Sequence, residues 1–258
     1  MKKIELWGLN VVLSGVLLFG VNILCAQESV SEGVTKDVTA KNEGNEAWKG
    51  KNYKDAFVNW EKYLESVNFQ DPACVYNVAL AANKIDNHVA AEKYFDMSIK
   101  NNYKATNSYL GKAQAQEDLN KTDEMISTLE AGLQAYPGND KLEKAYGTHF
   151  LKEGVSAQKA KNTDKAIESY AKVVTLKDVD LQVKANSALA SLYFNAGVTI
   201  LQKATPIANT NKELYESEKE KAKTEMKKAL DYANKAKELD ATNKEAKDLV
   251  AQIQKALK

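Results

Sequence analysis

The sequence predicts an all-α fold built from repeated pairs of helices, and three observations support this. Beyond residue 26 the chain is rich in Ala, Lys, Glu, Leu and Asn, and its apolar residues recur at helical spacing. The three prolines, Pro72, Pro137 and Pro206, fall between helical segments, where a helix breaker is tolerated. Small and aromatic residues also recur in a fixed order, and no run of alternating polar and apolar residues indicates strands.

Residues 1–26 are predicted to be a signal peptide. Lys2 and Lys3 precede an apolar run over residues 6–26, and the sequence after Ala26 is abruptly polar. A basic start, an apolar stretch and a small residue at its end are typical of a secretory signal that is cleaved at that point. The sequence therefore predicts an exported protein that begins at Gln27.

Two alternatives to simple cleavage stay open. The apolar run is about long enough to span a bilayer as an uncleaved anchor. Cys25 suggests a lipid-modified cysteine, although Leu24 stands where such a site favours a small residue. Residues 27–40, which follow the signal, are polar and are predicted to form a flexible N-terminal tether.

The charge composition argues against a nucleic-acid partner. The chain has 36 basic and 35 acidic residues, a formal net charge of +1, and every basic residue is a lysine. Neither a net positive charge nor arginine side chains are available to bind phosphates or read bases. Evenly mixed charge instead indicates solvated helix surfaces. This also holds for the lysine-rich segment "EKEKAKTEMKK", for which contact with an acidic surface or a membrane stays an alternative.

Nothing in the sequence predicts an enzyme, a metal or a cofactor. After cleavage Cys74 is the one remaining cysteine, and a single thiol forms neither an internal disulfide nor a metal cage. His88 and His149 have no metal-ligand spacing around them. The chain lacks a glycine-rich phosphate loop, a nucleophile elbow and an H-E-x-x-H motif. We therefore expect a non-catalytic protein.

The repeated pattern has two parts. One part is a small residue. The other is a pair of residues four apart, usually an alanine followed by an aromatic residue, which begins twelve positions after the small residue in the first four repeats and 32 positions after it in the fifth. The pairs are Ala56/Trp60, Ala91/Phe95, Met125/Leu129 and Ala166/Tyr170, with Ala229/Ala233 as a weaker fifth. The small residues, here called anchors, are Gly44, Ala79, Ala113, Gly154 and Gly197, at spacings of 35, 34, 41 and 43 residues. We interpret the anchors as points of close helix approach beside the large side chains.

A helix–turn–helix unit with a period near 34 is the signature of tetratricopeptide repeats (TPR), and the sequence resembles that family over about residues 37–241. "AYPGN" places Pro137 at the family's terminal proline, and "ELDATN" is similar to its "LDPxN" ending, with Ala241 in place of proline. The family's initial tryptophan and glycine are mostly replaced. The resemblance implies an α-solenoid of about five repeats over residues 41–241.

The irregular spacings predict two longer elements and a cap. Seven extra residues around "DKLEKAYGTHF" lengthen the first helix of repeat four by about two turns. In repeat five, the loop "TPIANTN" leads to a helix of about 28 residues, roughly 42 Å long. Residues 242–258 begin with a capping-box pattern, Thr242 and Glu245, and carry an apolar face, so they are predicted to form a C-terminal capping helix.

The resemblance also implies a binding groove lined by the first helix of each repeat. Its predicted peptide-binding residues are Lys41, Asn45, Trp48, Tyr76, Asn77 and Asn83. Further groove positions fall at Lys49, Leu80, Lys84, Asn107, Leu110, Gln114, Glu117, Asp118, Leu151, Val155, Gln158 and Lys159. Trp48 is a candidate hot-spot residue for binding a partner, with packing against the next helix pair as the alternative. Trp60 is expected to be structural.

Some TPR co-chaperones hold the C-terminal carboxylate of a peptide with a set of lysine and asparagine side chains. Lys41, Asn45 and Asn77 match the first three positions of that set. Asn107 and Gly111 occupy the last two, so both of the basic residues expected there are missing. A terminal-carboxylate clamp and more general peptide binding in the same groove therefore stay open as alternatives.

The sequence as a whole predicts a non-catalytic scaffold that holds a protein or peptide partner. Some exported repeat proteins of Bacteroidetes-type bacteria look similar in their last repeat, which implies a location in the periplasm or cell envelope of a Gram-negative bacterium. Two alternative functions are a component of an outer-membrane assembly or envelope-maintenance complex and a small-ligand-binding protein. The partner's identity cannot be read from the chain.

Overall fold

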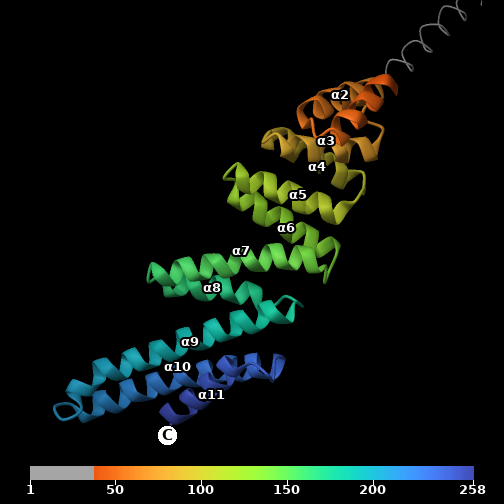
Figure 1. Cartoon of the computed structure of the whole chain (residues 1–258). Coiled ribbons are helices and arrows are strands. Elements are labelled where there is room, and N and C mark those ends of the chain that lie inside the picture. The colour runs from red at the N-terminus through yellow and green to blue at the C-terminus, as the bar shows by residue number, and fades with distance from the viewer. Residues whose placement is uncertain (1–37) are drawn as a thin grey trace, which may run out of the picture. The chain divides into compact units, whose positions relative to one another are not determined.

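The computed structural model describes residues 38–258, so the predicted signal peptide and residues 27–37 of the predicted tether lie outside the described residues. Residues 38–40 of that tether are already helical. The chain divides into two compact units, one ending at Tyr103 and the other spanning Lys104–Lys258. Every regular element of the described part is a helix, as Figure 1 shows.

Unit 1 contains a helix over residues 38–49 and three further helices. These are α2 (Tyr53–Ser66), α3 (Pro72–Lys84) and α4 (His88–Lys100). Unit 2 contains seven α-helices and one short 3₁₀ turn, η1. They are α5 (Ala105–Asp118), α6 (Thr122–Ala135), α7 (Asp140–Lys159), α8 (Thr163–Val173), α9 (Val179–Ala204), η1 (Thr205–Ile207), α10 (Lys212–Leu239) and α11 (Lys244–Ala256).

Asparagine and aspartate side chains start most of these helices. Each accepts a hydrogen bond from the backbone N–H three residues later, which satisfies one of the free donors of the first turn. These residues are Asn52, Asp71, Asn87, Asn139, Asn162, Asp178, Asn211 and Asn243. The predicted capping box at Thr242 is therefore wrong by one residue: Asn243 caps α11, and the Thr242 hydroxyl donates to Asp240 instead.

Each of the first four repeats turns between its two helices in the same way. The residue seven positions after the anchor has a left-handed backbone, with φ near 60° at Lys51, Asp86, Asn120 and Lys161. The next backbone N–H bonds back to a carbonyl five residues earlier, as from Asn52 to Ala47 and from Asn162 to Ala157. This pattern is a Schellman motif, which satisfies the last carbonyls of the first helix. The turn length is therefore constant even where the repeat length is not.

The predicted contact between anchor and large side chain is confirmed at Gly44 and Gly154. A Cβ atom placed on Gly154 would lie 2.5 Å from Cε1 of Tyr170, and one placed on Gly44 would overlap the indole of Trp60. Both rings are almost fully buried. Because no side chain fits between the glycine and the ring, the ring packs directly on the backbone of the first helix and sets the distance between the two helices of these pairs.

The predicted pair in repeat five is wrong. A Cβ atom on Gly197 would lie 2.8 Å from both the carbonyl oxygen of Ala222 and Cγ of Met226, so Ala222/Met226 is the pair opposite this anchor. Ala229 is instead buried further along α10, in a core cluster that also contains Ile253 of α11. The contact moves two turns toward the start of α10 because α9 and α10 form a long antiparallel pair whose register depends on their shared packing.

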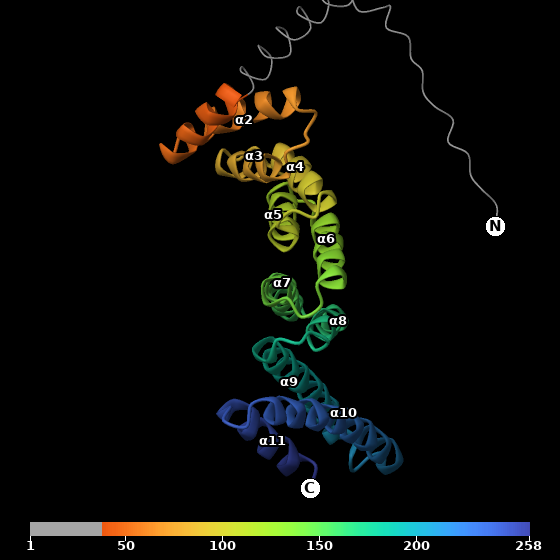
Figure 2. The same ribbon diagram turned by 90° about the vertical axis from the view of Figure 1, so that its right-hand side faces the viewer.

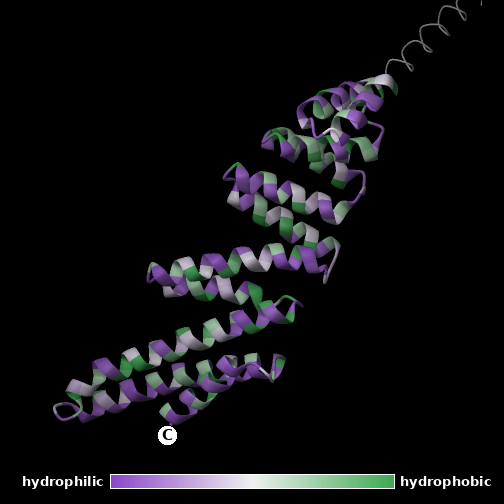
Figure 3. Cartoon of the chain, in the orientation of Figure 1, coloured by the Kyte–Doolittle hydropathy of each residue, from purple (hydrophilic) through white to green (hydrophobic). Residues whose placement is uncertain are grey.

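The predicted long elements are present in unit 2. Helix α7 has 20 residues, against 14 for α5, and α10 has 28. Figure 2 shows α5 and α7 in one row, with α6 and α8 in a second row beside them. Figure 3 shows that hydrophilic residues predominate along α10, in keeping with its mixed Lys and Glu sequence. The row of first helices is where the family groove is expected.

Candidate functional site

Unit 1 contains a pocket of about 300 Å³ that brings together three of the six predicted binding residues. Asn45 and Trp48 come from the helix over residues 38–49, and Asn77 comes from α3. The complete lining is Asn45, Trp48, Lys49, Trp60, Asn77 and Leu80. Two first helices thus converge on one site, as the groove prediction requires.

An indole network holds one side of this unit 1 pocket. The Nε1–H of Trp60 donates to Oδ1 of Asn45 over 3.1 Å. The ring of Trp48 lies 5.6 Å from that of Trp60 and 5.0 Å from that of Tyr53, measured between centroids. Trp48 therefore packs on neighbouring rings and also lines the pocket. Trp60, which the sequence predicts to be structural, is likewise part of the core and part of the pocket wall. Its spacing in the sequence reveals only the structural role.

The amide groups of the unit 1 pocket retain hydrogen-bonding capacity. Oδ1 of Asn45 already accepts one hydrogen bond from Trp60, whereas its Nδ2 group makes none within residues 38–258 and is the donor that can serve a partner. Among residues 38–258, Asn77 has no side-chain hydrogen bond, so both its donor and its acceptor are available. One asparagine offers a donor and the other offers both functions, which suits the alternating N–H and C=O groups of a polypeptide backbone.

Lys41 does not line this pocket. Its amino group lies 2.6 Å from Oδ2 of Asp71 and 4.9 Å from the centre of the Tyr63 ring. The Tyr63 hydroxyl also donates to Oδ2 of Asp71, and the N–H of Cys74 donates to Oδ1. The charge of Lys41, which the clamp hypothesis assigns to a peptide carboxylate, is therefore compensated within unit 1.

Tyr76 and Asn83 are also absent from the pocket lining. Tyr76 is only 7% exposed and packs edge-on against the rings of Phe95 and Tyr103. Its large ring thus completes the core of the repeat. Asn83 is half-buried, and its Oδ1 atom is buried without a hydrogen-bond partner. These two residues do not join Asn45, Trp48 and Asn77 in one site.

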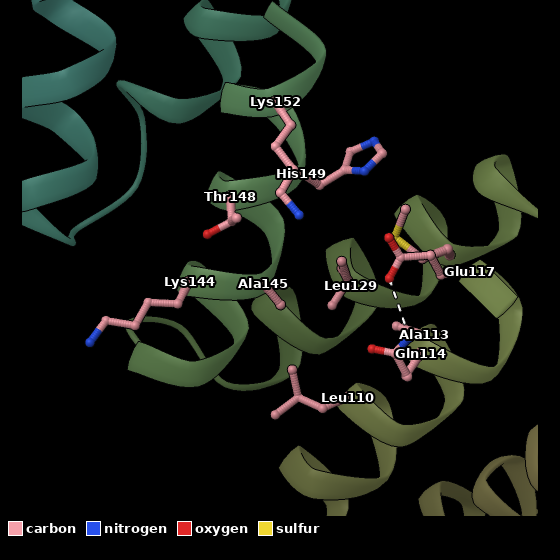
Figure 4. Close-up of a pocket in the computed structure, with 11 residues that line it drawn as sticks. Leu110, Ala113, Gln114, Glu117, Leu129, Lys144, Ala145, Thr148, His149 and Lys152 are labelled. Atoms are coloured by element: carbon pink, nitrogen blue, oxygen red, sulfur yellow. Dashed lines mark hydrogen bonds between the residues drawn. The ribbon is translucent and has the colours of Figure 1, made fainter. Parts of the chain in front are cut away.

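Unit 2 has a larger pocket, of about 420 Å³, between α5, α6 and α7 (Figure 4). Its predicted members are Leu110, Gln114 and Glu117. Ala113, Met125 and Leu129, which the sequence assigned to helix packing, line the pocket as well. The members that the sequence did not single out at all lie on α7: Lys144, Ala145, Thr148, His149 and Lys152. The seven extra residues in repeat four were the available signal, because they extend α7 alongside α5 and so build a second wall.

A second pocket of about 420 Å³ in unit 2 lies further along α7 and shares Lys152 with the first. It includes three predicted groove residues, Leu151, Val155 and Lys159. Gln158, predicted to face the groove, does not line it, because its Oε1 atom accepts a hydrogen bond of 2.6 Å from the Tyr170 hydroxyl. Of the groove positions predicted for repeats three and four, Leu110, Gln114, Glu117, Leu151, Val155 and Lys159 thus line one of these two pockets.

Comparison with solved structures decides the family. The crystal structure of a TPR repeats protein from Bacteroides fragilis NCTC 9343 is 40% identical to this chain, with a TM-score of 0.82, and the match covers 86% of this chain and 99% of that one. The chain belongs to the TPR repeat family. This confirms the all-α repeat solenoid that the sequence predicts. TPR proteins generally serve as scaffolds for protein interactions.

More distant solved TPR structures also match. The TPR domain of P58(IPK) is 12% identical with a TM-score of 0.43, covering 89% of this chain and 68% of that one. A thermophilic TPR protein from Thermus thermophilus is 19% identical with a TM-score of 0.34, covering 86% of this chain and 98% of its own. At these values neither adds to the family assignment. No protein-family model and no curated protein matches the chain.

Neither a metal cluster nor a membrane-spanning helix is found in residues 38–258. No three His, Cys, Asp or Glu side chains in this range come together as a metal site would require. None of its helices combines the length and apolar character needed to cross a membrane.

The hydrogen bonds to the Asp71 carboxylate predict how the stability of the protein depends on pH. Burial acts to raise the pKa of Asp71, but the hydrogen bonds from Lys41 and the Cys74 N–H, together with the Lys41 charge, hold it below the usual value. A carboxylate whose pKa is lowered by folding stabilises the protein above its unfolded pKa of about 4, and this contribution is lost as the pH falls through the folded pKa. Asp71→Asn keeps a capping acceptor and removes the charge. We expect it to lower the free energy of unfolding by about 1–2 kcal/mol at pH 7.

Urea denaturation of the wild type and Asp71→Asn at pH 7 and at about pH 3 measures this effect, and the difference between the two proteins should shrink at the lower pH. Asp231→Asn, at an exposed position of α10, is the matched control. A difference that stays constant across this range would contradict the assigned role of the Asp71 charge.

Proposed function

We propose that the protein is a non-catalytic scaffold of the bacterial cell envelope that binds protein or peptide partners through the pockets of its first helices. The observation that carries the binding proposal is the meeting of Asn45, Trp48 and Asn77 in one pocket of unit 1. Family membership supports a scaffold in general. The pocket adds a surface with an aromatic side and free amide groups.

The chemistry of this pocket favours backbone recognition over capture of a chain terminus. The amides of Asn45 and Asn77 match the N–H and C=O groups of an extended segment. Trp48 offers a large, partly exposed ring against which a partner side chain can pack. A terminal carboxylate would need an uncompensated positive charge, and Lys41 is already paired with Asp71. The lysine that the clamp hypothesis assigns to the peptide carboxylate is therefore already used in an ion pair.

The envelope location rests on the N-terminal segment. Residues 1–26 have the order of a secretory signal: basic start, apolar run and small residue at the end. This order supports export, which in a Gram-negative bacterium leads to the periplasm or outer envelope.

Asn77→Leu tests the binding proposal. The substitution keeps the approximate shape of the side chain and removes its hydrogen bonds, and since Asn77 bonds to nothing else in residues 38–258, the fold should be unaffected. In pull-downs from envelope extract with the chain from Gln27, we expect Asn77→Leu to retain its partners about tenfold less well than the wild type.

Asn59→Leu, on the partly exposed surface of α2 outside the pocket, is the matched control and should behave like the wild type. Circular dichroism checks that both variants are folded. Equal retention of partners by Asn77→Leu and by the control would show that this pocket is not the binding site.

The location has its own test. Cell fractionation followed by mass spectrometry of the N-terminus should find the protein in the envelope with Gln27 as its first residue. Intact Met1 in a cytoplasmic fraction would contradict export. A lipid-modified Cys25 at the N-terminus would show that the protein is a lipoprotein and is not cleaved after Ala26.

A further inference from the structure

Helix α7 separates its charges by face. Lys144, Lys152 and Lys159 line the two pockets of unit 2, which we call together the α7 groove. The acidic residues of the same helix bond elsewhere. Glu143 is 4% exposed and accepts hydrogen bonds from the N–H groups of Lys177 and Asp178, at the start of α9.

Glu153 completes this separation. Its carboxylate accepts a hydrogen bond of 2.8 Å from Ser169 and lies 3.2 Å from the amino group of Lys165, both on α8. The remaining charges of α7, Asp140 and Lys141, lie in its first turn and do not line either pocket. The groove side of α7 is therefore basic because its carboxylates are used to hold α8 and α9.

The groove lysines have no partners of their own. Many lysines of this chain, such as Lys165, Lys221 and Lys228, form ion pairs. By contrast, Lys144, Lys152 and Lys159 form no ion pair with any residue of the described range. The pocket linings contain these three lysines against one carboxylate, that of Glu117, which Gln114 of α5 already binds at 3.4 Å. The groove thus presents uncompensated positive charge.

His149 adds a polar ring to the wall of the pocket between α5, α6 and α7. Its Nε2 atom is buried and has no hydrogen-bond partner in the described chain. Because protein atoms cover this nitrogen, a ligand in the pocket does not reach it. In Figure 4 the side chains of His149 and Lys152 extend from α7 into the space that Gln114 and Glu117 border, whereas Lys144 points away.

The floor of the groove is apolar, which narrows the class of ligand. Leu110, Met125, Leu129 and Ala145 line the pocket between α5, α6 and α7. Val155, in the pocket further along α7, is 44% exposed. A nucleic-acid strand would match the lysines but would leave this floor uncovered, and no arginine is present to contact bases. An occupant with carboxylates and apolar side chains matches both features.

We propose that the α7 groove binds an extended, acidic polypeptide segment that carries apolar side chains. This rests on the proposed scaffold function and names the partner class for unit 2. From Ala145 to Lys159 the helix rises about 21 Å, which an extended segment of about seven residues would cover. Carboxylates of the segment lie near Lys152 and Lys159, and its alternate apolar side chains cover the leucines and Val155.

Fluorescence anisotropy with two labelled heptapeptides tests this proposal. The first is acetylated, amidated Glu-Leu-Glu-Leu-Glu-Leu-Glu, and the second has glutamine at every glutamate. Blocking both ends removes the terminal charges, so a terminal-carboxylate clamp cannot explain the binding. We expect the chain from Gln27 to bind the acidic peptide at least tenfold more tightly than the glutamine peptide, with an affinity that falls as salt is raised.

The matched variants are Lys152→Gln/Lys159→Gln in the groove and Lys227→Gln/Lys235→Gln on exposed positions of α10. Each removes two charges from unit 2. The groove variant should bind the acidic peptide at least tenfold more weakly, and the α10 variant should bind it like the wild type. Circular dichroism establishes that both are folded.

Three outcomes would overturn the inference. Equal binding of the two peptides would show that the groove takes polypeptides without regard to charge, which leaves the scaffold function intact. If a seven-nucleotide single-stranded DNA binds more tightly than the acidic peptide, the ligand class of the groove is a nucleic acid and not a polypeptide. If neither peptide binds, the inference fails. The scaffold function then fails with it only if the pull-down also retains no partner.

Discussion

The contact between a small residue on the first helix of a repeat and a large side chain on the second sets the geometry of the other features. At Gly44 and Gly154 the opposing ring occupies the volume that a methyl group would need. The distance and the register of the helix pair are therefore fixed together. The turn follows seven residues after the anchor in each of the first four repeats, and an aspartate, an asparagine or a lysine occupies its left-handed position there.

The same large side chains connect the core to the candidate sites. The Trp60 ring fills the space beside Gly44 and sends its N–H to Asn45, which orients an amide of the unit 1 pocket. The Tyr170 ring fills the space beside Gly154 and sends its hydroxyl to Gln158. In both repeats an aromatic residue with a polar tip packs as a hydrocarbon and still satisfies its donor on the first helix. A change in the packing of these rings would therefore also change the orientation of polar side chains on the first helices.

Most of the architecture could be predicted from the sequence because it depends on spacing within helices. The anchors, the aromatic residues and the lengths of α7 and α10 follow from counts along the chain. The pair in repeat five could not be placed in this way. Once both helices are long, several alanines of α10 can meet Gly197, and the packing of α9 and α11 against α10 decides between them.

The site was only partly predictable because its residues acquire partners from distant segments. Lys41 meets Asp71 thirty residues later, and nothing in the spacing of either residue shows that the pair will form. Tyr76 fits a groove position by count, yet its ring is drawn into the core by Phe95 and Tyr103. The α7 wall was indicated by an insertion, but which of its lysines stay unpaired depends on where Glu143 and Glu153 are used.

A double-mutant cycle at Gly154 and Tyr170 measures the anchor contact most directly. Repeat three already combines an alanine anchor with a leucine, Ala113 with Leu129, so that pairing is compatible with the fold. Urea denaturation should show that Gly154→Ala destabilises the wild type by about 1–3 kcal/mol through overpacking, but has little effect in the Tyr170→Leu background. The same loss in both backgrounds would show that the anchor and the ring are not coupled, and would contradict the account.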